Sequence, residues 1–223
     1  MNDHASAPVE GIRDEVIALK RERIMAAAVD LFYERGYERT TLEAVAERLG
    51  VTKPFIYSYF NSKTELLAEI CARGIESSLA AMNSVLGTRM SPTEKLRLLG
   101  HRFVIAVLES QKHIAIFSRE EKNLLSEDFE RISSLRREFD KKLTSLIDAG
   151  VRSHEFSVGD SRLAALAIGG MVSWAYVWYR PHGRFELSEI AERMSELILA
   201  MAHARPKNRA TARVGRRRRN PAT

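Results

Sequence analysis

The sequence of 223 residues has one cysteine, Cys71, and no uninterrupted apolar segment long enough to cross a bilayer. A lone cysteine excludes a disulfide framework and a cysteine-based zinc site, and it is typical of proteins kept in a reducing compartment. The first residues, MNDHASAPVEGIRDEV, lack the apolar core of a secretory signal peptide. These absences predict a cytoplasmic protein that is neither exported nor inserted in a membrane.

Motifs of catalytic and metal-binding sites are missing as well. The sequence contains no G-x-S-x-G, no phosphate-binding glycine loop and no supported cysteine–histidine pairing. No two of the histidines considered as ligands have the four-residue spacing of a helical metal site or share a carboxylate motif. Those histidines are His101, His113, His154, His182 and His203. We therefore expect no catalytic residues, no metal and no cofactor, and hence a protein that is not an enzyme.

Acidic residues are absent from residues 205–223, which carry eight of the 35 lysines and arginines. The rest of the chain has 27 bases against 29 acids, so the net charge of +6 belongs to this tail. Its composition predicts a disordered basic tail. The run Arg216–Arg219 would either bind nucleic acid without sequence preference or act only as a solubilising tail, and both interpretations stay open.

Apolar residues recur at three- and four-residue spacing through almost all of residues 20–204, whereas valine-rich alternating segments are missing. This pattern predicts an all-α protein of about nine helices. The helices are expected at about 20–35, 40–49, 53–60, 62–80, 91–108, 113–124, 127–149, 160–179 and 187–204. Residues 1–19 are expected to form a flexible arm.

Capping signals mark several of the expected helix starts. Thr40 with Glu43, and Ser62 with Glu65, have the spacing of a capping box, in which a hydroxyl and a carboxylate satisfy free backbone amides. Thr52 is expected to cap the third helix. Glu43 has an alternative interpretation as a residue that reads a DNA base.

The segment VTKPFIYSYFNSKTEL, residues 51–66, contains four aromatic rings beside lysines and hydroxyls. Two short helices joined by LGVTK are typical of a helix-turn-helix, and Ile56 and Phe60 share the side that packs on the preceding helix. A solvated helix rarely exposes as much aromatic surface as the remaining residues carry. In a DNA major groove, tyrosine and lysine can hold phosphates and a phenylalanine ring can contact thymine methyl groups.

Residues 20–67, which include GYERTTLEAVAERLGVTKPFIYSYFNSKTELL, resemble the tetracycline-repressor (TetR) family of bacterial transcription regulators. The resemblance rests on the "TT" before the second helix, "GV-T-K" at the turn, "IY-YF" in the third helix and "SK-EL" at the start of the fourth. It implies a DNA-binding head over 20–66 and a ligand-binding and dimerisation body over 67–204. The homodimer would bind a pseudo-palindromic operator in double-stranded DNA.

The resemblance also implies roles for individual residues of the head. Contacts with the DNA backbone fall on Thr41, and contacts with phosphates on Tyr57, Tyr59 and Lys63. Positions at or near base edges are Thr52, Lys53, Pro54, Phe55 and Ser58. The family often has a small or hydroxylated residue where Phe55 stands, so its operator preference does not transfer. Alternatively, the two tyrosines fill a seam between helices three and four, and Lys63 is an ordinary solvated residue.

In the body, the family architecture implies a cavity for an apolar effector. The candidate lining residues are Phe103, Val107, Phe117, Phe129, Met171, Trp174 and Trp178, which could instead be ordinary core. The segment WYRPHGRFELSEIAERM is similar to one in members that respond to acyl-coenzyme A, which makes Arg180 and Arg184 candidates for the phosphates of the coenzyme. These arginines could also simply complement a helix dipole.

The dimer would be built from the last two long helices, where Gly169 and Gly170 permit close approach. The predicted function is that of a DNA-binding transcription regulator, a repressor released from its operator by a small apolar or acyl-CoA-like effector. Two alternatives remain open: a repressor of a multidrug-efflux system with a broad pocket, and a nucleoid- or RNA-binding protein that acts through its basic tail.

Overall fold

The computed structural model describes residues 7–203, and all regular secondary structure in this range is helical. This confirms the predicted all-α fold. The tail at 205–223 and the first six residues of the expected arm lie outside the described residues. Ten α-helices and one short 3-10 helix occur in the described part of the chain: α1 (Ala7–Arg35), α2 (Leu42–Leu49), α3 (Lys53–Tyr57), α4 (Lys63–Leu86), α5 (Pro92–Glu109), α6 (Gln111–Glu120), η1 (Glu121–Asn123), α7 (Ser126–Arg152), α8 (Ser161–Ser173), α9 (Ala175–Trp178) and α10 (Leu187–His203).

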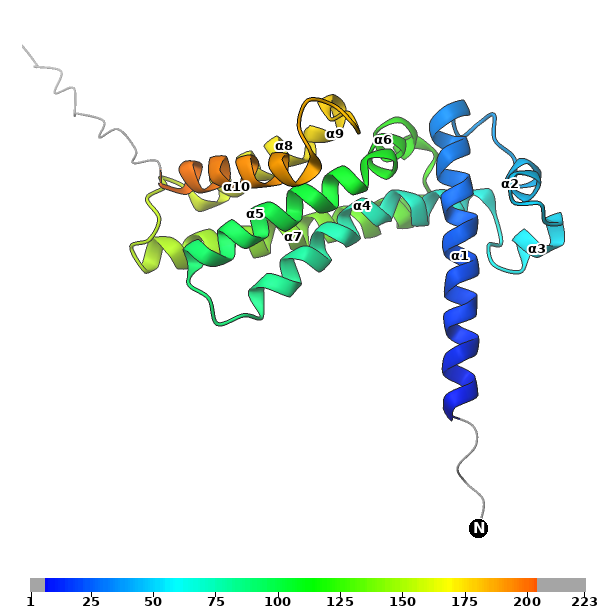
Figure 1. Ribbon diagram of the computed structural model, residues 1–223, viewed down its shortest axis with the longest axis horizontal. Helices are drawn as coiled ribbons and strands as arrows, with labels where there is room; N and C mark the ends of the chain where they lie inside the picture. Colours follow the sequence, from blue (N-terminus) through cyan, green and yellow to red (C-terminus); the bar gives the residue numbers. More distant parts are fainter. Residues whose placement is uncertain (1–6, 204–223) are drawn as a thin grey trace, which may run out of the picture.

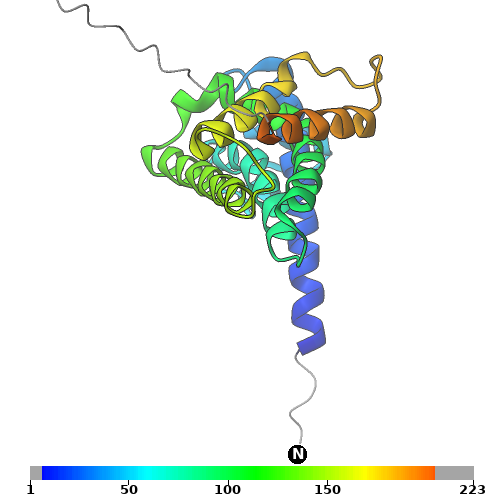
Figure 2. The same cartoon turned by 90° about the vertical axis from the view of Figure 1, so that its left-hand side faces the viewer.

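The molecule has a small head and an elongated body (Figure 1). The head consists of α1 to α3 and the start of α4, and it sits at one end of the body. In the body, α5 packs between α4 and α10, and α7 packs against α4 and α8. Viewed from the end opposite the head, these helices surround a common core (Figure 2). Helix α4 runs through both parts and therefore connects them.

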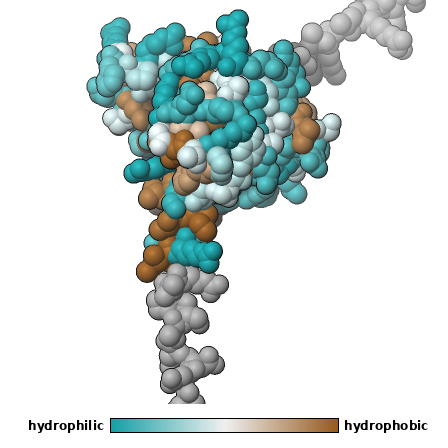
Figure 3. Space-filling view, turned by 90° about the vertical axis from the view of Figure 1, so that its right-hand side faces the viewer, coloured by the Kyte–Doolittle hydropathy of each residue, from teal (hydrophilic) through white to brown (hydrophobic). Residues whose placement is uncertain are grey.

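Helix α1 contradicts the expected flexible arm over residues 7–19, because it begins at Ala7. Its first 13 residues extend beyond the head as a projecting helix (Figures 1 and 3). Proline is tolerated in a first helical turn, and Gly11 is the one poor helix former among residues 9–19. The sequence analysis placed the start too late because it counted only residues that pack in the head, the first of which is Ile24.

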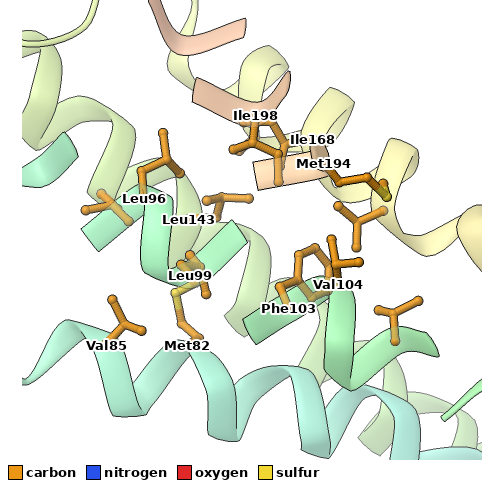
Figure 4. Packing of buried hydrophobic residues seen from close by; sticks show 14 of the residues in the cluster. Met82, Val85, Leu96, Leu99, Phe103, Val104, Leu143, Ile168, Met194 and Ile198 are labelled. Atoms are coloured by element: carbon orange, nitrogen blue, oxygen red, sulfur yellow. The ribbon is translucent and has the colours of Figure 1, made fainter. Parts of the chain in front are cut away.

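Two clusters of buried side chains hold the molecule together. The body core contains Leu99, Phe103, Leu143 and Ile198, which approach one another from α5, α7 and α10 (Figure 4). The head core is built on α1 to α4, but it also includes Ile116 of α6 and other residues beyond 66. A boundary at residue 66 therefore cuts through the head core, since α4 contributes to both clusters.

Two of the predicted capping residues are wrong. Thr41, rather than Thr40, is the N-cap of α2, and its hydroxyl accepts from the Ala44 amide at 3.2 Å. Thr40 is fully buried and its hydroxyl donates to the Gly36 carbonyl at 2.9 Å. Thr52 occupies the N-cap position of α3, but its side chain makes no capping hydrogen bond. A sequence cannot separate neighbouring threonines when the turn before the helix decides which one faces the core.

Three helix boundaries also differ from the prediction. Helix α3 ends at Tyr57, because a turn at Ser58 and Tyr59 leads the chain towards α4. Helix α4 continues to Leu86 instead of ending near residue 80. The helix expected over 160–179 breaks at Trp174 into α8 and α9. The two glycines before this break lower helix propensity, which helps to explain the interruption.

Candidate functional site

Helices α2 and α3 form the expected helix-turn-helix, with one side of α3 buried. Ile56 and Phe60 are fully buried against a core that includes Val45. Between the helices, Gly50 has a positive φ of 66°, a left-handed conformation that costs glycine little. The amide of Val51 bonds to the Ala46 carbonyl at 3.0 Å and closes the turn. Packing therefore fixes which side of α3 faces outward.

The outward side of α3 carries most of the predicted DNA-contacting residues. Thr52, Pro54 and Ser58 are exposed, and Tyr57 keeps 44% of its surface accessible. The Ser58 hydroxyl donates to the Phe55 carbonyl at 2.7 Å. Together these side chains form a convex, exposed surface at the end of the molecule, which suits insertion into a groove.

Phe55 and Tyr59 are less exposed than Tyr57. Their ring centroids lie 5.1 Å apart, and both rings pack at the edge of the head core. The Nζ of Lys20, on α1, lies 5.9 Å from the Phe55 ring and 6.0 Å from the Tyr59 ring. The two rings thus pack at the edge of the head core, near α1. Each has one side packed there and one side open to a partner.

Lys53 and Glu43 form an ion pair that joins the starts of α3 and α2. The hydrogen bond with Lys53 lowers the pKa of the Glu43 carboxyl, and the same bond raises the pKa of Lys53. Lys53 also lies 5.6 Å from the Tyr57 ring. Both partners of the pair are exposed, so the ammonium can exchange this carboxylate for a phosphate at small cost.

Lys63, at the start of α4, has a structural contact that the sequence analysis missed. Its Nζ donates to the carbonyls of Tyr37 and Thr40, both at 3.0 Å, and lies 4.1 Å from the Tyr37 ring. An ammonium has three donors, so one remains for a phosphate. Lys63 is therefore not an ordinary solvated residue, because it ties α4 to the turn before α2.

The body contains a cavity of about 560 Å³ bounded by α4, α5, α6, α7, α8 and α9. Four of the predicted ligand-binding residues line it: Phe103, Val107, Phe117 and Trp174. The other lining residues are Gly74, Ile75, Ser78, Ile114, Ser118, Glu121, Arg136, Phe139, Asp140, Leu166, Gly169, Gly170, Ser173 and Tyr176. This volume is within the range of small-molecule sites.

One side of the cavity is charged, which the sequence analysis did not foresee. The Arg136 guanidinium lies 4.0 Å from the Phe117 ring centroid, and it makes no ion pair or hydrogen bond among the described residues. Desolvation lowers the pKa of Arg136 and raises the pKa of the Asp140 carboxyl, which Arg136 partly offsets. Arg136 and Asp140 are four residues apart and flank buried Phe139, a spacing that could have indicated a polar stripe beside the core.

Five of the predicted ligand-binding residues do not line this cavity. Phe129 and Trp178 are exposed on the surface, and Met171 packs against the body core. Arg180 folds back onto the carbonyls of Val177 and Tyr179, at 3.1 and 2.9 Å.

The fifth residue, Arg184, lies 4.9 Å from the Phe185 ring. The loop after α9 directs both arginines to the surface, so the guanidinium at the cavity is that of Arg136. Periodicity alone cannot distinguish the two sides of a helix that is apolar almost all round.

Side-chain contacts of α4 and α6 link the wall of the cavity to the head. Gly74 of α4 packs closely on Ile114 of α6, and both line the cavity. At the start of α6, Lys112 pairs with Asp30 of α1 at 2.6 Å, and at its end Glu120 accepts from the Tyr37 amide at 3.3 Å. A displacement of α6 at the cavity wall would therefore move α1 and the turn before α2.

Large apolar side chains remain exposed on α8, α9 and α10. They are Leu163, Leu166, Trp174, Val177, Trp178 and Leu197. Leu166 and Trp174 also line the cavity. Exposed apolar side chains of this size on consecutive elements indicate an interaction surface. Among the described residues, no group of histidines, cysteines and acids is arranged to hold a metal ion, and none of the helices is long and apolar enough to span a membrane.

Comparisons with known proteins agree with this architecture. Residues 24–70 match the family model "Bacterial regulatory proteins, tetR family", and residues 89–202, half of the chain, match "Tetracyclin repressor-like, C-terminal domain". The HTH-type transcriptional repressor KstR2 of Rhodococcus jostii is 26% identical over 182 residues, which cover 81% of this chain and 89% of that protein.

Solved structures give the same result. The TetR family transcriptional regulator PfmR from Thermus thermophilus has a TM-score of 0.73 and 30% identity, over 80% of this chain and 97% of that one. AibR, in complex with isovaleryl coenzyme A and operator DNA, has a TM-score of 0.66 and 24% identity, over 82% of this chain and 98% of its own. The chain belongs to the tetR family of bacterial regulatory proteins.

Proposed function

We propose that the chain is a cytoplasmic, homodimeric repressor that binds a pseudo-palindromic operator and leaves it when a small effector enters the body cavity. The observation that carries this proposal is the route from the cavity to the head along α4 and α6. The exposed apolar side chains of α8 to α10 supply a surface for a twofold dimer. Such a dimer would present two α3 helices to successive major grooves.

In the proposed complex, Tyr57 and the free donor of Lys63 hold phosphates and so set the register of the head. Thr41, at the start of α2, holds the backbone from the other side. Thr52, Lys53, Pro54 and Ser58 lie at or near base edges, and the open side of Phe55 contacts a thymine methyl group. Tyr59 contributes its hydroxyl to a phosphate while its ring stays at the edge of the head core.

The effector acts by binding one arrangement of the body more tightly than the other. Ile114, Phe117 and Ser118 of α6 line the cavity, whereas Ile116 on the same helix is part of the head core. A ligand that shifts α6 or α4 therefore changes the orientation of the head and the spacing of the two α3 helices in the dimer. Operator affinity falls by the ratio of the effector affinities for the two states.

The proposed effector has an apolar body and an anionic end, as an acyl-CoA thioester does. Phe103, Val107 and Phe139 offer apolar surface, and the guanidinium of Arg136 can form charge-assisted hydrogen bonds with a phosphate or carboxylate. The similar fold of AibR holds an acyl-CoA together with operator DNA. The carboxylates of Glu121 and Asp140 favour a second candidate, a lipophilic cation of the kind exported by drug-efflux systems.

A binding experiment separates the two effector classes. An operator is first selected from a randomised DNA library with the purified full chain, and its binding is measured by gel shift. Acyl-CoAs of increasing chain length and a panel of unrelated lipophilic cations are then tested for release of that operator and for a rise in melting temperature. Selective effects of acyl-CoAs support the first candidate, effects of many cations support the second, and failure to select any operator contradicts the regulator itself.

The third interpretation, nucleic-acid binding through the basic tail, has a separate test. Deletion of residues 205–223 removes eight cationic side chains from the chain. If the head recognises the operator, sequence-specific binding survives this deletion and only the nonspecific, salt-sensitive component falls. Loss of all specific binding would favour the tail as the binding element.

A further inference from the structure

The projecting part of α1 exposes large aliphatic side chains that the proposed function does not use. Ile12, Val16 and Leu19 keep 63%, 43% and 57% of their surface accessible. Ile17, on a neighbouring side of the helix, keeps 39%. Figure 3 shows hydrophobic surface on the projecting helix below the head. An isolated helix of this length is marginal in water, so an exposed apolar stripe on it indicates a partner.

The spacing of these residues is that of a helix that pairs with another helix. Ile12, Val16 and Leu19 are separated by four and three residues, which places them along a single seam. Glu15 and Lys20 flank this seam on opposite sides. A β-branched residue at the position of Val16, with leucine at the position of Leu19, favours two strands.

We propose that this segment of α1 pairs in parallel with the same segment of a second copy of the chain. In a parallel pair, Glu15 of one chain faces Lys20 of the other, and twofold symmetry forms this contact twice. The ammonium of Lys20 would exchange its position near the Phe55 and Tyr59 rings for this carboxylate. An antiparallel pair would instead bring Lys20 towards Arg13 of the other chain, so like charges would meet. The charge pattern therefore favours pairing with a second copy of the chain, and it favours the parallel over the antiparallel arrangement.

The second helix would also cover part of the proposed DNA-binding surface. A groove of about 610 Å³ runs along α1 beside this seam and shares Ile12 and Val16 with it, whereas Leu19 lies outside the groove. Its other lining residues are Arg13, Ile17, Lys20, Arg21, Ser58 and Tyr59. A helix seated in this groove abuts the turn after α3. Pairing and operator binding thus compete for the same side of the head, and this step alone rests on the proposed function. The paired form would store the regulator in a state that cannot bind DNA.

The test measures assembly mass in the absence of DNA, so its result does not depend on whether an operator exists. Sedimentation of the full chain is followed over a range of concentrations for the wild type and for the double variant I12E/V16E. The single variants V16E and A18E are the matched pair, because each adds one negative charge, on the apolar stripe and on the opposite side of the same helix. We expect the wild type to pair two of the dimers built on α8 to α10, the double variant to remain such a single dimer with half the mass, and A18E to keep the full mass.

Charge exchange tests the direction of pairing. E15K alone or K20E alone should dissociate the pair, whereas E15K/K20E should restore it, because the contact is then reversed in both chains. Excess selected operator should likewise convert the paired form into the smaller one. The proposal is wrong if wild type and I12E/V16E have equal mass at every concentration, or if I12E/V16E weakens operator binding without changing the mass. The second result would assign the apolar stripe to DNA.

Discussion

The head and the body are both built from helices, but their side chains are packed differently. In the head, Phe60 and Ile56 are fully buried and the polar residues of α3 face outward, so a short element is held in one orientation. In the body, long helices enclose a cavity of about 560 Å³ and leave a charged guanidinium beside it. The head, with its outward-facing α3, and the body, with its cavity, therefore share one continuous helix, α4.

Removal of a ring from the head core should have the largest effect. Phe60→Ala leaves a cavity in a site with no solvent exposure, and we expect the free energy of unfolding to fall by about 3–5 kcal/mol. Denaturant unfolding of the full chain measures the change. The control is Tyr57→Ala on the exposed side of α3, expected to stay within about 0.5 kcal/mol. Equal losses would show that the outer face of α3 is also packed.

The free energy of unfolding should depend on pH through His113. Burial lowers the pKa of His113 from 6.5 to about 4, with Arg73 and Lys112 acting in the same direction, and its Nδ1 has no partner among the described residues. Below pH 6.5 the unfolded chain binds a proton that the folded chain does not, so stability falls as the pH drops from about 6.5 to about 4. The full loss is on the order of 3 kcal/mol.

Urea unfolding at a series of pH values, compared with His113→Gln, isolates this loss from the titration of the carboxylates. The wild type should lose more stability than the variant between neutral pH and pH 4. Parallel curves for the two proteins would contradict the burial of a neutral imidazole at this position.

Arg136→Gln should weaken effector binding without changing operator binding. If Arg136 holds the anionic end of an effector, the substitution should weaken acyl-CoA binding about ten- to hundredfold, the range of a lost charge-assisted hydrogen bond. Calorimetric titration measures the affinity, and operator binding without effector should stay unchanged. Arg137→Gln is the matched control, because the neighbouring arginine is paired with Glu130 and does not line the cavity. Equal affinities for both variants would remove Arg136 from the site.

The smallest expected effects distinguish two rings of α3. Tyr57→Ala should weaken binding to all DNA sequences about three- to tenfold, because it removes a phosphate contact. Phe55→Ala should change the preference among operators, because its ring meets base edges. Binding of both variants to a randomised site reports the two patterns. If both variants lose affinity equally for all DNA sequences, Phe55 contacts the DNA backbone and not the base edges.

The head could be predicted more fully than the body because its signals are local. Gly50 in its left-handed turn and Ser62 at the start of α4 lie where the sequence places them. The exception is Thr40, whose burial depends on the turn at Gly36. The contacts of Lys63 could not be predicted from local sequence, since its two carbonyl partners lie more than 20 residues away.

The cavity was harder to predict because it depends on contacts between distant helices. Phe117 of α6 and Arg136 of α7 meet only after folding, and no local pattern in either helix reports their 4.0 Å separation. Arg180 and Arg184 were assigned by similarity of their segment, but the backbone after α9 turns them outward. Apolar periodicity identified the helices of the body without identifying the side that faces the cavity.

The continuity of α4 determines how completely a displacement can pass from the cavity wall to the head. Gly74, at the cavity wall, and Lys63, bonded to the turn before α2, are separated by three turns of one unbroken helix, about 16 Å. A helix resists compression along its axis, so any shift that starts at Gly74 reaches the other end at almost its full size. An axial displacement of α4 at the cavity wall therefore also displaces the turn before α2, to which Lys63 is bonded.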